Sequence, residues 1–153
     1  MDSSGSITED GDENWELVLE MVRLLIQSID SYSTIGVTSR VAIINYSSTV
    51  EVVADLSEKL NKDQLLSLIN NGAIVYFGKG TEMFRAVEEA NELFLANVRI
   101  VSGSIQATQA MILFTDGRVI VPPVALFITL MDRGVHVILI GKCTLISFAL
   151  VNL

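Results

Sequence analysis

The first six residues place oxygen-bearing side chains at alternate positions. Asp2, Ser4 and Ser6 bring one carboxylate and two hydroxyls close together along the chain. Oxygen atoms of this kind are the ligands that hard cations such as Mg²⁺ prefer in proteins. Ser and Asp are also preferred before the first turn of a helix, because they accept hydrogen bonds from its free N–H groups. These residues alone therefore leave a metal-binding loop and a helix cap both open, and favour the cap.

Two further polar turns carry a single oxygen ligand each. Thr81 ends the sequence GKGT, and Asp116 lies in FTDG. Each has a simple structural interpretation as well, since threonine can cap a helix and Asp-Gly can form a turn. Their meaning depends on the elements that position them.

The apolar pattern predicts an α/β fold that brings these turns together. Spacings of three and four predict helices, alternation predicts a β-hairpin, and continuous apolar runs are typical of strands buried on both faces. Strands separated by helices indicate a mostly parallel central sheet with helices on both faces, and ligands of such sheets bind at the carboxyl ends of the strands. The three polar turns all have that position. The helices are predicted at 15–29, 62–70 (closed by Gly72) and 81–95, the hairpin at 37–47 and 50–56, and the buried strands at 110–117 and 135–141.

Composition and charge exclude several classes of protein. The 153 residues, half of them hydrophobic, fit one domain covering 1–153. A net charge of -8 argues against binding to nucleic acid, which needs clustered Lys and Arg. The longest apolar run, 119–131, contains Pro122 and Pro123 and is shorter than the roughly 20 residues that cross a bilayer, so no membrane insertion is expected. The single cysteine, Cys143, excludes an internal disulfide.

In their order along the chain, the three motifs resemble the metal-ion-dependent adhesion site (MIDAS) of the von Willebrand factor A (vWA) domain family. The motifs are Asp2-x-Ser4-x-Ser6, Thr81 in GKGTEM and Asp116 in FTDG. The resemblance extends from Asp2 to about Gly141 and includes VAIINYSSTVEV in the place of the family's paired second and third strands. Because three separated motifs coincide at the expected ends of elements, a chance set of caps and turns is the weaker explanation.

The resemblance implies a Rossmann-like vWA fold whose site holds Mg²⁺ or Mn²⁺. Ser4 and Ser6 would ligate the metal directly, Asp2 would act mostly through water, and Thr81 and Asp116 would exchange direct and water-mediated roles as the domain switches. Two carboxylates leave the cation undercharged, so an acidic side chain of a protein partner completes its shell. The implied function is non-enzymatic, metal-dependent protein binding in extracellular matrix or cell adhesion, with collagen or another matrix protein as the kind of partner.

The sequence departs from the family's pattern near the site and at both ends. Lys79 and Glu82 add charges beside the site, and Met83 replaces a second threonine, which is expected to lower the affinity for the cation. The family places a buried apolar strand before the Asp2 motif, where only Met1 stands here, and no family-like elements follow Gly141. The chain is therefore expected to be a partial vWA domain that lacks its first strand, between the strands at 41–46 and 111–114.

Other functions and sites are weighed against this interpretation. An intracellular scaffold or complex subunit of the same fold would use metal-independent contacts. A metal-dependent hydrolase is weaker, because no general base accompanies the oxygen ligands. His136 lies in an apolar run and is interpreted as a core histidine, and the sequon at Asn45 lies in a predicted strand, which argues against glycosylation.

Overall fold

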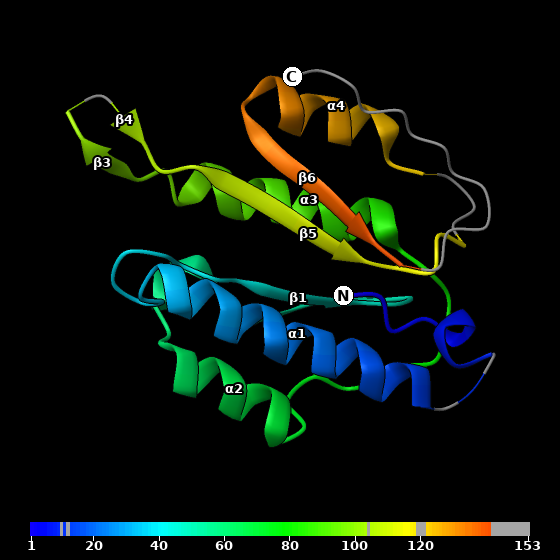
Figure 1. Ribbon diagram of the computed structural model, residues 1–153. Coiled ribbons are helices and arrows are strands. Elements are labelled where there is room, and N and C mark those ends of the chain that lie inside the picture. The colour runs from blue at the N-terminus through cyan, green and yellow to red at the C-terminus, as the bar shows by residue number, and fades with distance from the viewer. Residues whose placement is uncertain (10, 12, 104, 119–121, 142–153) are drawn as a thin grey trace.

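Figure 1 shows the computed structural model of the chain, which describes residues 1–141 except 10, 12, 104 and 119–121. The described part contains both helices and strands, interspersed along the chain, as the α/β prediction requires. Their bounds are η1 (Gly5–Thr8), α1 (Glu13–Tyr32), β1 (Ile43–Tyr46), β2 (Val50–Ala54), η2 (Leu56–Glu58), α2 (Lys62–Asn70), α3 (Met83–Ala96), β3 (Ile100–Ser102), β4 (Ile105–Gln106), β5 (Gln109–Phe114), α4 (Val124–Asp132) and β6 (Val135–Ile140).

The predicted helices and the predicted hairpin are present. α1 extends beyond both ends of its prediction, and α2 has the predicted bounds. Gly72 follows α2 with φ 71°, a left-handed conformation that suits glycine after a helix end. β1 pairs antiparallel with β2, and Asn45 in β1 is fully buried with its Nδ2 donating to the Val75 carbonyl oxygen at 2.7 Å. The sequon asparagine is therefore inaccessible in the folded chain.

The first three residues of the chain lie between β1 and β5 and hydrogen-bond to both. The Met1 amino group donates to Ile44 O at 2.6 Å, and Tyr46 N donates to Met1 O at 2.9 Å. On the other side, Asp2 N donates to Phe114 O at 2.9 Å. β5 in turn pairs with β6 in parallel along all six residues. Met1–Ser3 therefore connects the β1–β2 hairpin to the parallel pair β5–β6.

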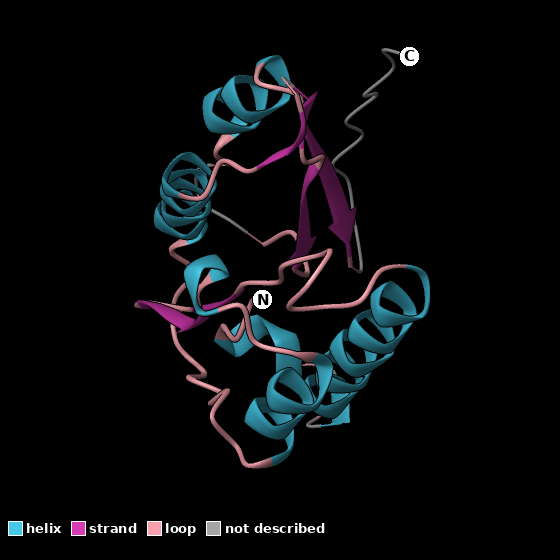
Figure 2. Ribbon diagram, turned by 90° about the vertical axis from the view of Figure 1, so that its left-hand side faces the viewer, coloured by secondary structure: helices cyan, strands magenta, loops and turns pink. Residues whose placement is uncertain are grey.

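Two apolar layers cover opposite faces of these strands, as Figure 2 shows for the helices on either side. α1 and α2 pack with Ile43, Ile112 and Phe114, whereas α3 and α4 pack with Met111 and Leu113. Alternate residues of β5 thus enter opposite layers, as expected of a strand covered on both faces. The helices of both layers hold β5 and its carboxyl end in place.

β6 and two shorter regions differ from the predictions. Ile138 is 46 % exposed and Leu139 42 %, and His136 is exposed, so the prediction of a core histidine is wrong. The reason is that β6 has only β5 as a strand neighbour in the described chain, which leaves part of its apolar run uncovered. α4 and the small β3–β4 hairpin were not predicted. No helix of the described part has the length and apolarity needed to cross a membrane.

Candidate metal centre

The loop Asp2–Ser6 turns its oxygen atoms toward one another. The buried Asp2 carboxylate accepts two hydrogen bonds. Its Oδ1 accepts one from Ser4 N at 3.0 Å, and its Oδ2 accepts one from the Thr115 hydroxyl at 2.8 Å. The Ser4 and Ser6 hydroxyls lie 3.1 Å apart. α1 starts only at Glu13, and Ser4, which precedes η1, makes no side-chain capping bond to the described residues. The motif therefore does not cap α1. Ser4 takes the N-cap position of η1, but its hydroxyl lies against that of Ser6 and does not bond to the N–H groups of that helix.

The turn that carries Thr81 is fastened to this loop through its backbone. Gly5 N donates to Lys79 O at 2.8 Å, and Gly78 N donates to Ser3 O at 2.9 Å. Ser47, at the end of β1, holds the turn from the other side, because its hydroxyl donates to Gly80 O at 2.9 Å. Thr81 itself is partly buried and lies two residues before α3. It is not the N-cap of that helix, so the structural alternative for this motif is also wrong.

Asp116 approaches the same region from the carboxyl end of β5. The hydroxyl of its neighbour Thr115 donates a hydrogen bond to the Asp2 carboxylate, and Phe114 O accepts a hydrogen bond from Asp2 N. Two consecutive residues therefore connect this turn to the Asp2 loop. Oδ1 of Asp116 accepts Arg118 N at 3.0 Å. Oδ2 is buried and has no hydrogen-bond partner in the described chain, although the Arg118 Nε atom lies 3.8 Å away. A buried carboxylate oxygen without a partner is costly, and a cation would satisfy it.

The five candidate residues fit a hard divalent cation. Their donors are two carboxylates and three hydroxyls, and the described residues contain no cluster of three or more His, Cys, Asp or Glu that would suit a softer or more acidic site. The structure joins the Asp2 loop to the Thr81 turn and to the Asp116 turn. The backbone contacts thus support the prediction that the three loops meet at one place. Their predicted position at the carboxyl ends of strands holds only for the Asp116 turn, which follows β5; the described chain has no strand before the Asp2 loop or between α2 and the Thr81 turn. Which of these oxygen atoms bind a metal stays a prediction.

Tyr46 is a residue of this region that the sequence did not reveal. It is fully buried, and its hydroxyl has no hydrogen-bond partner among the described residues. Burial, and then the nearby negative charge of Asp2, raise the pKa of Tyr46 well above its usual value. The hydroxyl therefore stays protonated beside the carboxylates. A tyrosine at the end of an apolar strand is a common pattern, so the sequence alone does not identify Tyr46 as part of a site.

The fold and this arrangement of loops define the chain as a member of the von Willebrand factor type A domain family, whose pattern matches residues 1–147. The predicted family and its Rossmann-like α/β fold are thereby confirmed.

Solved structures similar to the chain include proximal thread matrix protein 1 from the mussel byssus, at 27 % sequence identity and a TM-score of 0.74 over 92 % of this chain. The same mussel protein with a zinc-occupied MIDAS motif matches at 28 % identity and a TM-score of 0.72, again over 92 % of this chain. A manganese-loaded Plasmodium vivax TRAP protein matches 96 % of this chain at 28 % identity with a TM-score of 0.73. The chain spans 35 % and 36 % of the two mussel chains and 56 % of the TRAP chain.

Proposed function

We propose that Asp2, Ser4, Ser6, Thr81 and Asp116 hold a divalent cation through which the chain binds an acidic group of another protein. The observation that carries the proposal is that hydrogen bonds connect the hydroxyl-rich Asp2 loop to both other turns. One of these turns holds a buried Asp116 oxygen that has no hydrogen-bond partner among the described residues. Mg²⁺ and Mn²⁺ are the proposed cations, because the donors are all oxygen.

The proposed roles follow the exposure and contacts of each side chain. Both oxygens of Asp2 already accept hydrogen bonds, which suits a residue that reaches the metal through water. The Ser4 and Ser6 hydroxyls face each other and suit direct contact. Thr81 and Asp116, each partly exposed, lie on turns that can adjust when a ligand arrives. An open coordination position is then filled by a carboxylate of the partner.

The proposed setting is extracellular, with a matrix protein such as collagen as partner. The support is that the similar mussel protein is a thread matrix protein and has a MIDAS motif that binds zinc. The manganese-loaded TRAP protein supports a divalent metal in this fold. A non-enzymatic role is part of the same proposal.

Metal titration of single variants tests the site. Asp116→Ala and Ser4→Ala should each lower Mn²⁺ affinity at least about tenfold in calorimetry, since each removes one oxygen ligand. Asp132→Ala and Ser57→Ala are matched controls, because both residues lie on the surface away from the three turns. Thermal melts should show that Asp116→Ala keeps the fold. Unchanged Mn²⁺ binding in both site variants would contradict the assignment.

Partner capture tests the role of the cation. Pull-down of a matrix protein should be lost in EDTA and return with Mg²⁺, because the metal bridges oxygen atoms of the two proteins. Capture that survives EDTA unchanged would instead favour a scaffold with metal-independent contacts.

A further inference from the structure

Tyr76 lies between α2 and α3 in the chain, and its hydroxyl reaches the loop that carries the first proposed metal ligands. The hydroxyl oxygen lies 2.7 Å from the Thr8 hydroxyl, 3.2 Å from Ser4 O and 3.4 Å from Gly5 O. A tyrosine hydroxyl has one proton to donate, and a backbone carbonyl oxygen only accepts. Thr8 therefore donates to Tyr76, and Tyr76 donates its own proton toward the Ser4 and Gly5 carbonyl groups.

The ring of Tyr76 is held by two neighbours. It contacts the ring of Trp15 at the start of α1, with the ring centroids 5.5 Å apart, and Trp15 is itself buried. It also lies against Gly78, where a Cβ atom would come within 3.0 Å of Tyr76 Cε1. Gly78 has φ 62°, a left-handed conformation that suits glycine as well. These two contacts fix the place of the Tyr76 hydroxyl.

The Ser4 carbonyl connects this hydroxyl to two of the proposed ligands. It belongs to the planar peptide group between Ser4 and Gly5, so fixing it fixes the backbone on both sides. Ser4 O also accepts a hydrogen bond from Ile7 N at 3.2 Å, which closes the turn that contains Ser6. The Ser4 and Ser6 hydroxyls lie 3.1 Å apart on this turn. Tyr76 therefore acts on the backbone from which both hydroxyls project.

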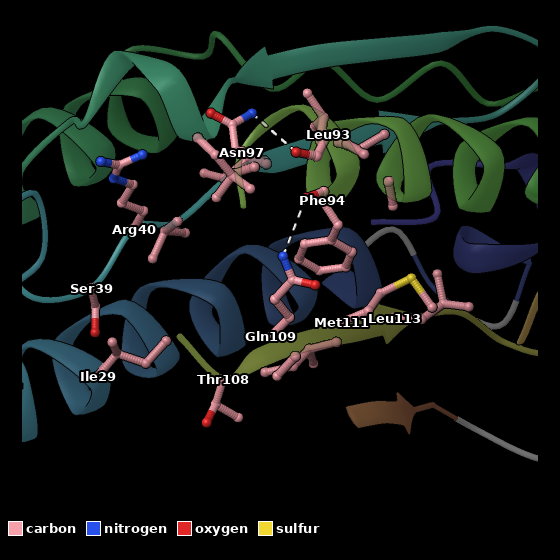
Figure 3. Close-up of a pocket in the computed structure, with 18 of the residues that line it drawn as sticks. Ile29, Ser39, Arg40, Leu93, Phe94, Asn97, Thr108, Gln109, Met111 and Leu113 are labelled. Atoms are coloured by element: carbon pink, nitrogen blue, oxygen red, sulfur yellow. Dashed lines mark hydrogen bonds between the residues drawn. The ribbon is translucent and has the colours of Figure 1, made fainter. Parts of the chain in front are cut away.

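These contacts are separate from the cavity of about 640 Å³ beside β1 and β5 (Figure 3). Apolar side chains such as Phe94, Met111 and Leu113 line that cavity, and neither Tyr76 nor Thr8 is among its described lining residues. The arrangement around Tyr76 therefore does not depend on how the cavity is filled.

We propose that Tyr76 is a positioning residue of the metal centre. Through Thr8 and the Ser4 carbonyl, its hydroxyl holds the Ser4 and Ser6 hydroxyls together before a cation binds. A loop that is ordered in advance loses less conformational freedom on binding, so the affinity for the cation is higher. The inference rests on the proposed metal site, and it assigns a role to a residue that does not itself contact the metal.

Metal titration of isosteric variants tests this role. Tyr76→Phe keeps the ring and removes the hydroxyl, so it should lower Mn²⁺ affinity about threefold to tenfold in calorimetry. Thr8→Val should lower it by a similar factor. The double variant should lose less than the product of the two factors, because both changes break the same chain of hydrogen bonds. Tyr32→Phe, at the exposed end of α1, is the matched control and should leave the affinity unchanged.

Hydrogen exchange of the metal-free chain gives a second readout, which does not require metal binding. In Tyr76→Phe, the amides of residues 4–7 should exchange several-fold faster, because the loop opens locally more often. The amides of α2 should exchange at the same rate in both chains. Trp15 is the only tryptophan of the sequence, and its emission should stay the same in Tyr76→Phe and shift in Tyr76→Ala, which removes the ring.

Three results would overturn the proposal: wild-type Mn²⁺ affinity in Tyr76→Phe, unchanged exchange of residues 4–7 in that variant, or factors that multiply in the double variant. Thr8→Val keeps the test decisive if Tyr76→Phe does not fold, since its loss of affinity and its faster loop exchange are expected for the same reason. A wild-type chain that binds neither Mn²⁺ nor Mg²⁺ would contradict the proposed function, and the exchange rates would still support or reject the hold of Tyr76 on the loop.

Discussion

At the scale of single residues, Asp116 combines a bound and a free carboxylate oxygen. Oδ1 is held by Arg118 N, whereas Oδ2 has no hydrogen-bond partner in the described chain and lies 3.8 Å from Arg118 Nε. Arg118 also pairs with Glu9, and both of these side chains are about half exposed. The arginine therefore partly neutralises the carboxylate that a cation would need.

Removing the arginine charge should strengthen metal binding. Arg118→Gln is expected to raise Mn²⁺ affinity about twofold to fivefold, because a positive charge several ångströms from a cation in a water-accessible site repels it by under about 1 kcal/mol. Arg133→Gln, at the end of α4, is the control and should leave the affinity unchanged. Calorimetry in low salt gives the comparison, and an equal or lower affinity of Arg118→Gln would show that the arginine supports the site.

The amino group of Met1 should make stability depend on pH. Burial lowers its pKa from the usual 8.0 to about 5, against the smaller opposite effect of the Asp2 charge. Between pH 5 and 8 the unfolded chain is protonated at this group and the folded chain is not, so the free energy of unfolding rises with pH across this window. At 1.36 kcal/mol for each pKa unit, the gain is roughly 4 kcal/mol.

Acetylation of the amino terminus provides the control for that prediction. The acetylated chain has no proton to bind there, so its urea midpoint should vary less between pH 5 and 8 than that of the free chain. Asp30 and Tyr46 do not contribute to the pH dependence between pH 5 and 8, because the pKa of Asp30 lies below this window and that of Tyr46 lies above it. Parallel pH profiles of the two chains would contradict the burial of Met1.

At the scale of elements, α2 shows what local sequence signals can specify. The Asn61 side chain accepts a hydrogen bond from Gln64 N at 3.0 Å, and the Gln64 side chain accepts one from Asn61 N at 2.9 Å. Together the two bonds form a reciprocal capping box. Asn61→Ala should lower the free energy of unfolding by about 1 kcal/mol, whereas Asn61→Ser should keep most of it. Urea midpoints of the two variants measure the difference, and equal values would show that the cap contributes little.

Elements with their own start and stop signals could be predicted, and those that depend on neighbours could not. α2 has a cap at Asn61 and a left-handed glycine at Gly72, and its bounds were predicted correctly. α4 follows Pro122 and Pro123, a permitted helix start, yet its apolar residues show no clear amphipathic pattern and it was missed. The exposure of β6 depends on which strand lies beside it, which the residues of β6 do not encode.

At the scale of the whole molecule, the candidate site depends on contacts between segments far apart in the chain. The types and order of Asp2, Ser4, Ser6, Thr81 and Asp116 could be recognised from sequence because they lie in three short polar motifs whose order matches that of the family. The contacts that fasten those turns come from Thr115 and Ser47, and the buried Tyr46 hydroxyl lies nearby. Their roles arise only when β1, the first residues and β5 are side by side, so sequence alone could not reveal them.

The stability of the whole chain should depend on how much of the space between β1 and β5 is filled. Each unpaired buried backbone group costs roughly 1–3 kcal/mol, and a strand of five or six residues would satisfy several, against the 5–15 kcal/mol that holds a typical domain folded. We therefore expect the 153-residue chain to unfold at low urea or to aggregate.

A chain with about six apolar residues added before Met1 should unfold cooperatively at higher urea. It should also bind Mg²⁺ more tightly, because the added strand would fix Met1–Ser3, whose bonds to β1 and β5 position the Asp2 carboxylate. An extension of equal length that alternates lysine with valine is the matched control, since both faces of the space are apolar. Urea melts and calorimetry of the three chains decide the matter: equal midpoints and equal Mg²⁺ affinities would show that the flanking strands already satisfy one another without an added strand.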